Sequence, residues 1–252
     1  MASSSQSRRS RREQLMAQRV AQAQKERNLR IMFVAVGVVV LALVIGVAIW
    51  GFSSQNNGGN SNNSVVNVPP NSDPDKNGIV LAPVKSGIPT LEIFSDYNCS
   101  VCRGADLTLN AVLQQAVESG TANVVFHALS LLTNTSRDAA IAATCADFQG
   151  KFFDYHNQLF LNQSGTGFDN TTLTETIPGI VGIEGDALTE FQSCVNNKDT
   201  GGFVDAEEAY AAKQNATTPP TFLLDGVNVG TQIWNANTKT YDPDNLRALL
   251  GM

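Results

Sequence analysis

The sequence predicts an α/β fold in which a βαβ unit is followed by a block of helices and then by a ββα segment. Residues 89–95 and 123–128 are β-rich runs that flank a stretch with helical periodicity, an order typical of a parallel strand pair. Residues 136–213 are alanine-rich and helical in period. Residues 221–229 and 242–250 have the patterns of a hairpin and a capped helix.

The N-terminal residues predict a membrane anchor that follows a basic head at residues 1–30. Residues 31–52 carry no charged side chain, and a helix of this length measures about 33 Å, enough to cross a hydrocarbon core of about 30 Å. A buried helix of a soluble protein is seldom apolar on all faces over this length. A cleaved signal peptide has a shorter apolar region, and Ala48-Ile49-Trp50 is a poor cleavage site. We therefore expect one span through the lipid bilayer.

Positive charge predicts the orientation of this span. Residues 1–52 hold eight Lys/Arg and two Glu, whereas only Lys76 and Lys85 follow within about 35 residues. Cationic flanks stay in the cytoplasm, so the sequence predicts a single-pass protein of the cell membrane with a cytoplasmic N-terminus and an extracytoplasmic body. The head either contacts anionic lipid or serves only as this topology signal.

Composition separates a linker from a folded body. Residues 53–77 are mainly Asn, Ser, Gly, Pro and Asp, which predicts a disordered tether, and residues 78–252 then form one domain. The chain has a net charge of −6 and the first 52 residues contribute +6, so the rest carries −12. Because phosphate binding needs clustered cations, we expect no nucleic-acid partner.

Local signals place the ends of the elements in the body. The first helix is expected over Cys99–Ser119 and ends at Gly120. A helical insertion then covers about 133–213. Asp225-Gly226 predicts the hairpin turn, and Asp242-Pro243 predicts the capped start of the last helix.

Cys99 and Cys102 form a CxxC motif where the first strand meets this helix. The motif alone also fits a zinc site, but this position is typical of a redox pair. The helix N-terminus favours the thiolate of Cys99, and Cys102 lies one turn further on the same face, within bonding reach. We therefore expect Cys99 to be the exposed nucleophile and Cys102 the shielded resolving thiol of disulfide exchange.

A second candidate site is the run Thr217-Thr-Pro-Pro-Thr-Phe222, just before the hairpin. Proline is unusual within a strand-like run, X-Pro bonds can be cis, and proline removes a ladder N–H. The preceding backbone is then free to pair with a substrate peptide. A plain turn or strand start explains the run equally well.

The chain resembles the DsbA-like thioredoxin-fold oxidoreductases over about 79–250, and most of all the membrane-anchored forms of Gram-positive, actinobacterial envelopes. The resemblance lies in Asp96-Tyr-Asn-Cys-Ser-Val-Cys102, Gln149-Gly-Lys-Phe-Phe-Asp-Tyr-His-Asn-Gln-Leu-Phe160 and Pro219-Pro-Thr-Phe-Leu-Leu-Asp-Gly226. It implies a thioredoxin fold with an inserted α-helical domain. It also implies that Pro220 is the cis-proline and that Pro219, Pro220 and Thr221 bind substrate.

Two positions differ from the pattern of this family. Between the cysteines the family often has Pro followed by His or an aromatic residue, and this chain has Ser100-Val101. That dipeptide tunes thiolate stability in the family, so the redox poise of this chain is open. The residue before the cis-proline is usually Thr or Val, and here it is Pro219, which restricts the backbone that grips substrate.

The resemblance also implies a structural disulfide between Cys145 and Cys194, because actinobacterial members often have one in the helical insertion. A resolving or shuttling role for this pair is the alternative. A single four-cysteine zinc site fits less well, since such sites usually show two short-spaced pairs. We expect no metal and no cofactor other than the redox-active Cys99–Cys102 disulfide.

Other polar residues are weaker candidates. Glu92, in the first strand, either lies near the thiols as a buried acid that moves protons or faces outward from the strand. His127 and His156 are the only two histidines, and both are interpreted as packing residues.

The expected function is an extracytoplasmic thiol-disulfide oxidoreductase that introduces disulfides into reduced, unfolded secreted proteins through its CSVC site. The resemblance implies reoxidation by a membrane partner of the DsbB or VKOR type. One alternative is the same fold acting as a reductase, for example in cytochrome c maturation. The other is a non-catalytic module that binds peptides in the cis-proline groove.

Overall fold

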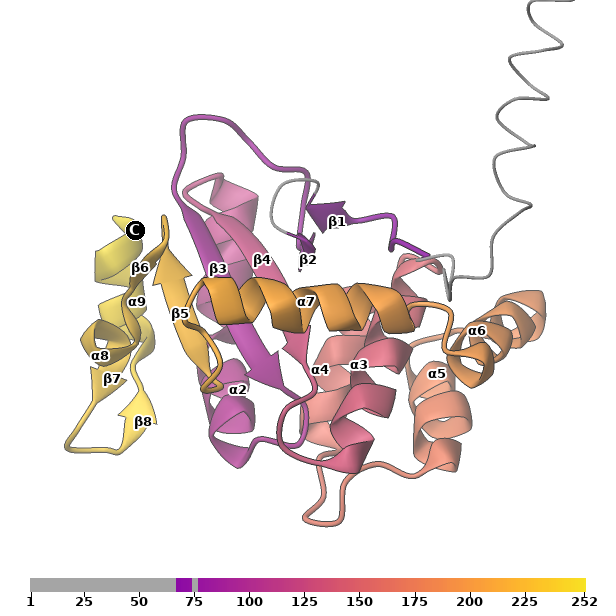
Figure 1. Cartoon of the computed structure of the whole chain (residues 1–252). Coiled ribbons are helices and arrows are strands. Elements are labelled where there is room, and N and C mark those ends of the chain that lie inside the picture. Colours follow the sequence, from indigo (N-terminus) through magenta and orange to yellow (C-terminus); the bar gives the residue numbers. More distant parts are fainter. Residues whose placement is uncertain (1–66, 74–76) are drawn as a thin grey trace, which may run out of the picture. The chain divides into compact units, whose positions relative to one another are not determined.

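The computed structural model describes residues 67–73 and 77–252 (Figure 1). The predicted basic head, the predicted membrane span at 31–52 and most of the predicted linker lie outside the described residues. Among the residues that are described, no helix combines the length and the apolar character of a membrane span.

Six strands form the central sheet in the order β1-β2-β4-β3-β5-β6. β3 and β4 are parallel, and the other neighbouring strands pair antiparallel. The strands are Ser72–Asp73 (β1), Asn77–Val80 (β2), Thr90–Asp96 (β3), Asn123–Leu129 (β4), Thr221–Leu224 (β5) and Val227–Asn228 (β6).

The predicted βαβ unit is confirmed. α2 (Ser100–Ser119) connects β3 to β4 and ends at Gly120, whose φ of 69° lies in the left-handed region that glycine tolerates. The Gly120 N–H donates to the carbonyls of Ala116 and Val117. β3 is buried along almost its whole length because it has a neighbour on both edges and helices on both faces.

The predicted helical insertion is also present. Thr133 precedes its first helix and forms a capping box with Ser136. The helices are α3 (Asn134–Asp147), α4 (Phe152–Leu161), the π-helical η1 (Thr172–Thr176), α5 (Ile177–Ile180), α6 (Gly185–Asn197) and α7 (Gly201–Lys213).

The C-terminal segment contains the predicted hairpin and capped helix. Asp225 and Gly226 both have positive φ, 48° and 80°, as a tight β5–β6 turn requires. Asp242 caps the start of α9 (Pro243–Leu250), and its side chain accepts the backbone N–H groups of Asp244 and Asn245. Between them lie elements that the sequence analysis did not predict. These are α8 (Gly230–Ile233), β7 (Trp234–Asn235) and β8 (Thr240–Tyr241).

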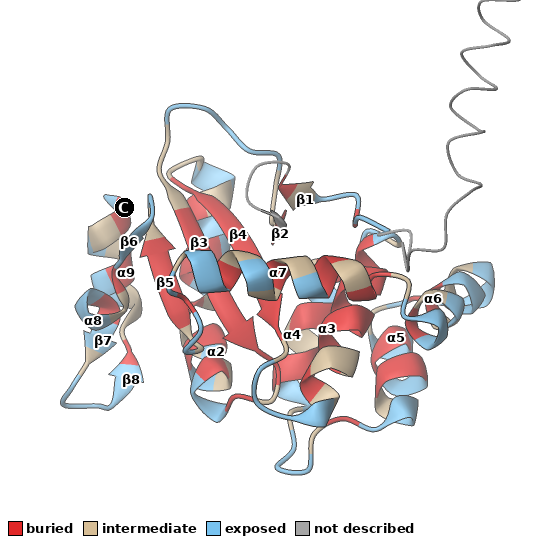
Figure 2. Ribbon diagram, in the orientation of Figure 1, coloured by how far each residue is buried: buried red, intermediate tan, exposed pale blue. Residues whose placement is uncertain are grey.

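Helices cover both faces of the sheet. In Figure 1, α7 crosses the front face and α2 lies behind it, and Figure 2 shows the buried residues gathered on β3, β4 and β5 and on the inner sides of the helices. The main core lies on the α2 side. A smaller core lies under α7 and is formed by Phe94, Leu129, Ala211, Ala216 and Leu223.

The folded body begins within the segment predicted as linker. β1 pairs with β2, and Asn71 is held by Asp147 of α3 through its backbone N–H and its side-chain amide, both at 2.8 Å. The polar composition of this segment gives no signal for the pairing, because its partner is a buried carboxylate 76 residues away.

Candidate active site

Cys99 and Cys102 are joined by a disulfide, with their Cα atoms 5.1 Å apart. Cys99 is the N-cap of α2, and its Sγ accepts the backbone N–H of Cys102 at an N–S distance of 3.1 Å. The first turn of α2 carries no acidic side chain. The Cys99 sulfur therefore lies at the positive end of a 20-residue helix, which stabilises a thiolate formed there on reduction.

The two sulfurs differ in access. Cys99 is 7% exposed, whereas Cys102 is fully buried at 0%. The exposed fraction of Cys99 is smaller than predicted, because the Pro219 carbonyl lies against its sulfur. Cys99 nevertheless provides the sulfur that an incoming thiol meets first.

The Pro219–Pro220 segment lies beside the disulfide. The peptide bond between the two prolines is cis, and the Pro219 carbonyl oxygen is 3.7 Å from the Sγ of Cys99. Both prolines are partly exposed, while the following Thr221 is buried and begins β5 opposite Phe94. The structure therefore brings the proline segment next to Cys99 and Cys102, although Pro219 lies 120 residues after Cys99 in the sequence.

Asp96 fixes the turn before Cys99. This fully buried carboxylate accepts the backbone N–H of Asn98 at 2.8 Å and the hydroxyl of Ser136 at 2.8 Å. It also accepts the N–H groups of Leu131 and Leu132, at 2.9 and 3.0 Å, in the loop after β4. This role was not predicted from the sequence. The available signal was an acidic residue directly after an apolar strand.

A second support comes from Gln163, after α4. Its side-chain amide donates to the carbonyls of Tyr97 and Cys99, at 2.7 and 3.0 Å. The amide holds the backbone on the N-terminal side of the disulfide against the helical insertion. Local sequence gives no signal for such a contact, because Gln163 lies 64 residues from Cys99.

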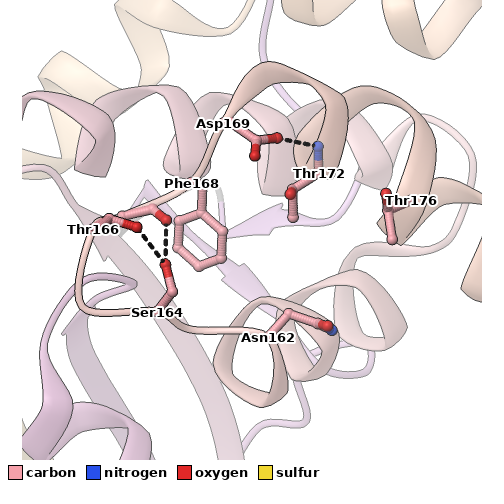
Figure 3. Close-up of a pocket in the computed structure, with 8 residues that line it drawn as sticks. Asn162, Ser164, Thr166, Phe168, Asp169, Thr172 and Thr176 are labelled. Carbon is pink, nitrogen blue, oxygen red and sulfur yellow. Dashed lines mark hydrogen bonds between the residues drawn. The ribbon is translucent and has the colours of Figure 1, made fainter.

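The same loop borders a polar pocket of about 540 Å³ (Figure 3). The Ser164 hydroxyl donates to the Gly167 carbonyl at 2.7 Å, and Asp169 accepts the Thr172 N–H at 2.7 Å. That backbone hydrogen bond lowers the pKa of Asp169. These polar groups bind one another within the loop, so we interpret the pocket as a feature of the loop structure.

A depression of about 240 Å³ is lined in part by Ser100 and Val101, the two residues between the cysteines. Val101 of α2, 50% exposed, and Trp234 of β7, 36% exposed, both line it. The remaining lining residues are Ser100, Gly104, Ala105, Lys239, Thr240 and Tyr241. Exposed apolar side chains next to a reactive sulfur form a surface that can hold an unfolded chain.

The expectation that Glu92 lies near the thiols disagrees with the structure. Ile93 and Ser95 share a small cavity with residues of α2, so the side chain of Glu92 points to the opposite face of β3. There its carboxylate accepts the hydroxyl of Tyr210 of α7 at 2.8 Å. Both faces of β3 are buried, and strand alternation alone cannot tell which face carries α2.

Glu92 belongs to a buried cluster on the α7 side. His127 of β4 contacts Glu207 of α7 at 2.8 Å and Glu92 at 3.4 Å, and its ring stacks on Phe94 at 4.1 Å. Burial disfavours a charged imidazole, but the hydrogen bonds to Glu207 and Glu92 outweigh it and raise the pKa of His127. Burial raises the pKa of Glu207, partly offset by His127.

We expect the folded chain to lose stability as the pH rises above about 6.5, the ordinary pKa of histidine. A raised pKa of His127 contributes stability that is complete below its unfolded pKa of about 6.5 and is lost as the pH passes the folded value. The raised pKa of Glu207 acts in the same direction. Urea unfolding of the full chain in mild detergent at pH 6 and pH 9 measures this loss. His127→Gln should flatten the difference, and an equal loss in that variant would contradict the assignment.

Cys145 of α3 and Cys194 of α6 form the second disulfide, with a Cα–Cα distance of 5.9 Å. Cys145 is completely buried. Within residues 67–73 and 77–252, no group of three or more His, Cys, Asp or Glu side chains is arranged to hold a metal ion.

Comparisons with known proteins agree with this geometry. A family model described as thioredoxin matches residues 86–247. No curated protein sequence matches the chain.

Several solved structures share the fold. A thioredoxin-like oxidoreductase from Silicibacter pomeroyi is 23% identical, with a TM-score of 0.54 and coverage of 76% of this chain and 96% of that one. MdbA, a thiol-disulfide oxidoreductase from Corynebacterium diphtheriae, is 18% identical, with a TM-score of 0.56 and coverage of 64% and 87%. DsbA from Mycobacterium tuberculosis is 18% identical, with a TM-score of 0.52 and coverage of 71% and 88%.

The family match covers more than half of the chain, and it includes the CxxC motif, the helical insertion and the proline segment. The similar structures share the arrangement of sheet and helices that brings these parts together. The chain belongs to the thioredoxin family and has the fold seen in DsbA-type thiol-disulfide oxidoreductases.

Proposed function

We propose that this protein is a thiol-disulfide oxidoreductase that transfers its Cys99–Cys102 disulfide to reduced, unfolded secreted proteins. The observation that carries the proposal is the Cys99–Cys102 disulfide at the N-terminus of α2, with the Pro219 carbonyl 3.7 Å from the Cys99 sulfur. A reactive sulfur and an open backbone acceptor next to it are what exchange with a peptide thiol requires.

The access of the two sulfurs assigns their roles. A client thiolate attacks Sγ of Cys99, the S–S bond breaks, and its electron pair leaves on Cys102. A second client thiolate then attacks the client sulfur of this mixed disulfide and releases the thiolate of Cys99. The client gains a disulfide and the protein becomes a dithiol. The α2 N-terminus stabilises the Cys99 thiolate that leaves in the last step.

Two surfaces beside Cys99 can hold the client. The Pro219 carbonyl accepts a hydrogen bond from the client backbone, but Pro219 has no N–H to donate in return. The depression with Val101 and Trp234 takes client side chains. The client backbone is therefore bound through the Pro219 carbonyl without a matching N–H donor from Pro219. Such limited backbone binding favours the acceptance of many client sequences.

We propose that the reaction takes place outside the cytoplasm, on a domain anchored by residues 31–52. The uncharged run and the cationic residues before it support this topology. A membrane oxidant, of the DsbB or VKOR type in proteins that this chain resembles, would return Cys99 and Cys102 to the disulfide.

The direction of exchange depends on the reduction potential. Ser100-Val101 offers no imidazole to the Cys99 thiolate, so the helix N-terminus provides most of its stabilisation. We expect a moderately oxidising couple, between about −270 mV for thioredoxin and about −120 mV for DsbA.

Equilibration of the protein with glutathione buffers, with Cys99–Cys102 oxidation followed by thiol alkylation, measures this potential. Oxidation of a reduced, unfolded client by the full chain, with a Cys99→Ala control, measures the activity. A potential at or below that of thioredoxin would contradict the oxidase direction and favour the reductase.

A further inference from the structure

The Cys145–Cys194 disulfide borders a pocket at the surface of the helical insertion. Cys145 of α3 is fully buried, whereas Cys194 of α6 is only partly buried. Both cysteines line the pocket, which has a volume of about 210 Å³. The other residues that line it are Asn67, Phe148, Gln149, Glu190, Phe191 and Asp199. A thiol that enters the pocket therefore meets the sulfur of Cys194 first.

The pocket carries two carboxylates. Glu190 is exposed on α6 and lies one turn before Cys194, and the partly buried Asp199 follows the end of that helix. Within the described part of the chain, neither carboxylate takes part in an ion pair. The thiolate is the form of a thiol that attacks a disulfide. Two negative charges at the entrance therefore raise the free energy of its approach to Cys194.

The two lysines closest in sequence to the pocket residues are each paired with an acidic side chain. Lys198 follows the last residue of α6, and its Nζ lies 3.1 Å from Oδ1 of Asp138. Lys151 precedes α4, and its Nζ lies 3.3 Å from Oδ2 of Asp154. Because each of these positive charges has an acidic partner of its own, the negative charge of the pocket carboxylates is not balanced by them.

Both sulfurs also lie at helix ends that disfavour negative charge. Cys145 is in the last turn of α3 and Cys194 is in the last turn of α6, and neither turn has a basic side chain. The C-terminus of a helix is the negative end of its dipole, so it destabilises a thiolate formed there. Cys99 lies at the N-terminus of α2, where the dipole has the opposite effect. The two disulfides of this protein therefore have opposite electrostatic surroundings.

Opening of the second disulfide would place a thiolate on Cys145. When an external thiolate attacks Sγ of Cys194, the S–S bond breaks and its electron pair leaves on Sγ of Cys145. The Cys145 sulfur is buried, and its polar contact is the neutral hydroxyl of Thr200, at 3.7 Å. Burial and the end of α3 both disfavour the charged form of this sulfur, which makes it a poor leaving group.

We propose that Glu190 and Asp199 determine which disulfide of this protein reacts, by excluding thiolates from Cys194. This inference rests on the proposed function, because reduced clients attack as thiolates and the chain offers them two disulfides. The pocket carboxylates slow the approach of a client thiolate, and the helix ends disfavour the leaving sulfur. Client exchange is thereby directed to Cys99, and the bond that links α3 to α6 stays closed in a reaction that always involves free thiols.

Small thiols of opposite charge test this exclusion. The oxidised full chain, in mild detergent, is incubated with cationic cysteamine or with anionic mercaptoethanesulfonate, at equal thiolate concentrations. The temperature is one at which cysteamine opens both disulfides. Alkylation at intervals, followed by mass spectrometry, gives the opening rate of each bond. The variant is Glu190→Gln, Asp199→Asn. The matched control is Glu184→Gln, Asp186→Asn, which removes the same charge at the other end of α6.

We expect the wild-type Cys145–Cys194 bond to open more slowly with the anionic thiol than with the cationic one. The pocket variant should open this bond faster with mercaptoethanesulfonate, by roughly fivefold or more, the effect of one unit charge at about 4 Å in water. Opening of Cys99–Cys102 should keep its wild-type rate, and the control variant should change neither rate. An unchanged rate in the pocket variant overturns the proposal. An equal acceleration in the control variant also overturns it, because the effect would then come from net charge.

The position of the first thiol adduct tests the point of attack. After an acid quench, the adduct should be found on Cys194, with Cys145 as the free thiol. An adduct on Cys145 would contradict the assignment of Cys194 as the accessible sulfur. Neither measurement uses a client protein. Failure of the wild type to oxidise a reduced client would therefore contradict the proposed function, whereas failure of the charge selection would contradict only the role of Glu190 and Asp199.

Discussion

A Cys102→Ala variant should accumulate mixed disulfides with client proteins, and a Cys99→Ala variant should form none. Without Cys102, only a second client thiolate can resolve a mixed disulfide between Cys99 and a client, because the protein has no thiol of its own next to Cys99. Without Cys99, the remaining thiol is fully buried and clients cannot reach it. Exchange activity in Cys99→Ala should therefore fall to the background of an unreactive thiol. Non-reducing electrophoresis of the full-length variants, followed by identification of the trapped chains, measures the outcome.

The control for this experiment is the double variant Cys145→Ser, Cys194→Ser, which keeps the CxxC pair and should trap no client. Trapping by Cys99→Ala in place of Cys102→Ala would reverse the two roles. That outcome would also contradict the assignment of the α2 N-terminus as the position of the attacking sulfur, since only Cys99 caps this helix.

Loss of the Cys145–Cys194 disulfide should produce the largest change in stability. The bond closes a loop with a sequence separation of 49 residues between α3 and α6. In the chain-entropy model, a loop of about 50 residues contributes about 4 kcal/mol to the free energy of unfolding. For a domain of this size the double serine variant should lose roughly 8–16 °C in Tm. Thermal unfolding of the variant and the parent chain, followed by circular dichroism, checks this.

The same double variant distinguishes a structural bond from a redox relay. The disulfide links two helices of the insertion, and Cys145 is fully buried. We therefore expect per-molecule thiol exchange at Cys99 to be preserved in the folded variant. A mild reductant should also open Cys99–Cys102 first. Loss of exchange in a variant that remains folded would show that the second pair takes part in the reaction.

The sequence by itself determined the order of the main elements, from β3 through the helical insertion to the β5–β6 hairpin and α9, and the position of the reactive cysteines. Strand and helix periodicity is local, and so are the signals that end an element, such as Gly120 after α2 and Asp225-Gly226 in the hairpin. The CxxC motif could be assigned because its chemistry depends on the helix that begins at Ser100. For the same reason the relation between Cys99 and Cys102 was predictable from their spacing alone.

The tertiary structure decided which polar side chains surround those cysteines. Glu92 lies on the α7 face of β3. This could not be predicted, because both faces of the strand are buried and the sequence does not show which face packs against α2. Asp106 meets His156 across 50 residues, and Asp96 binds a loop 35 residues away. Each contact joins elements through the packing of the sheet and the helices. The hydrogen bonds of buried groups depend on which helices and strands pack together. The periodicity of the sequence does not show which elements these are.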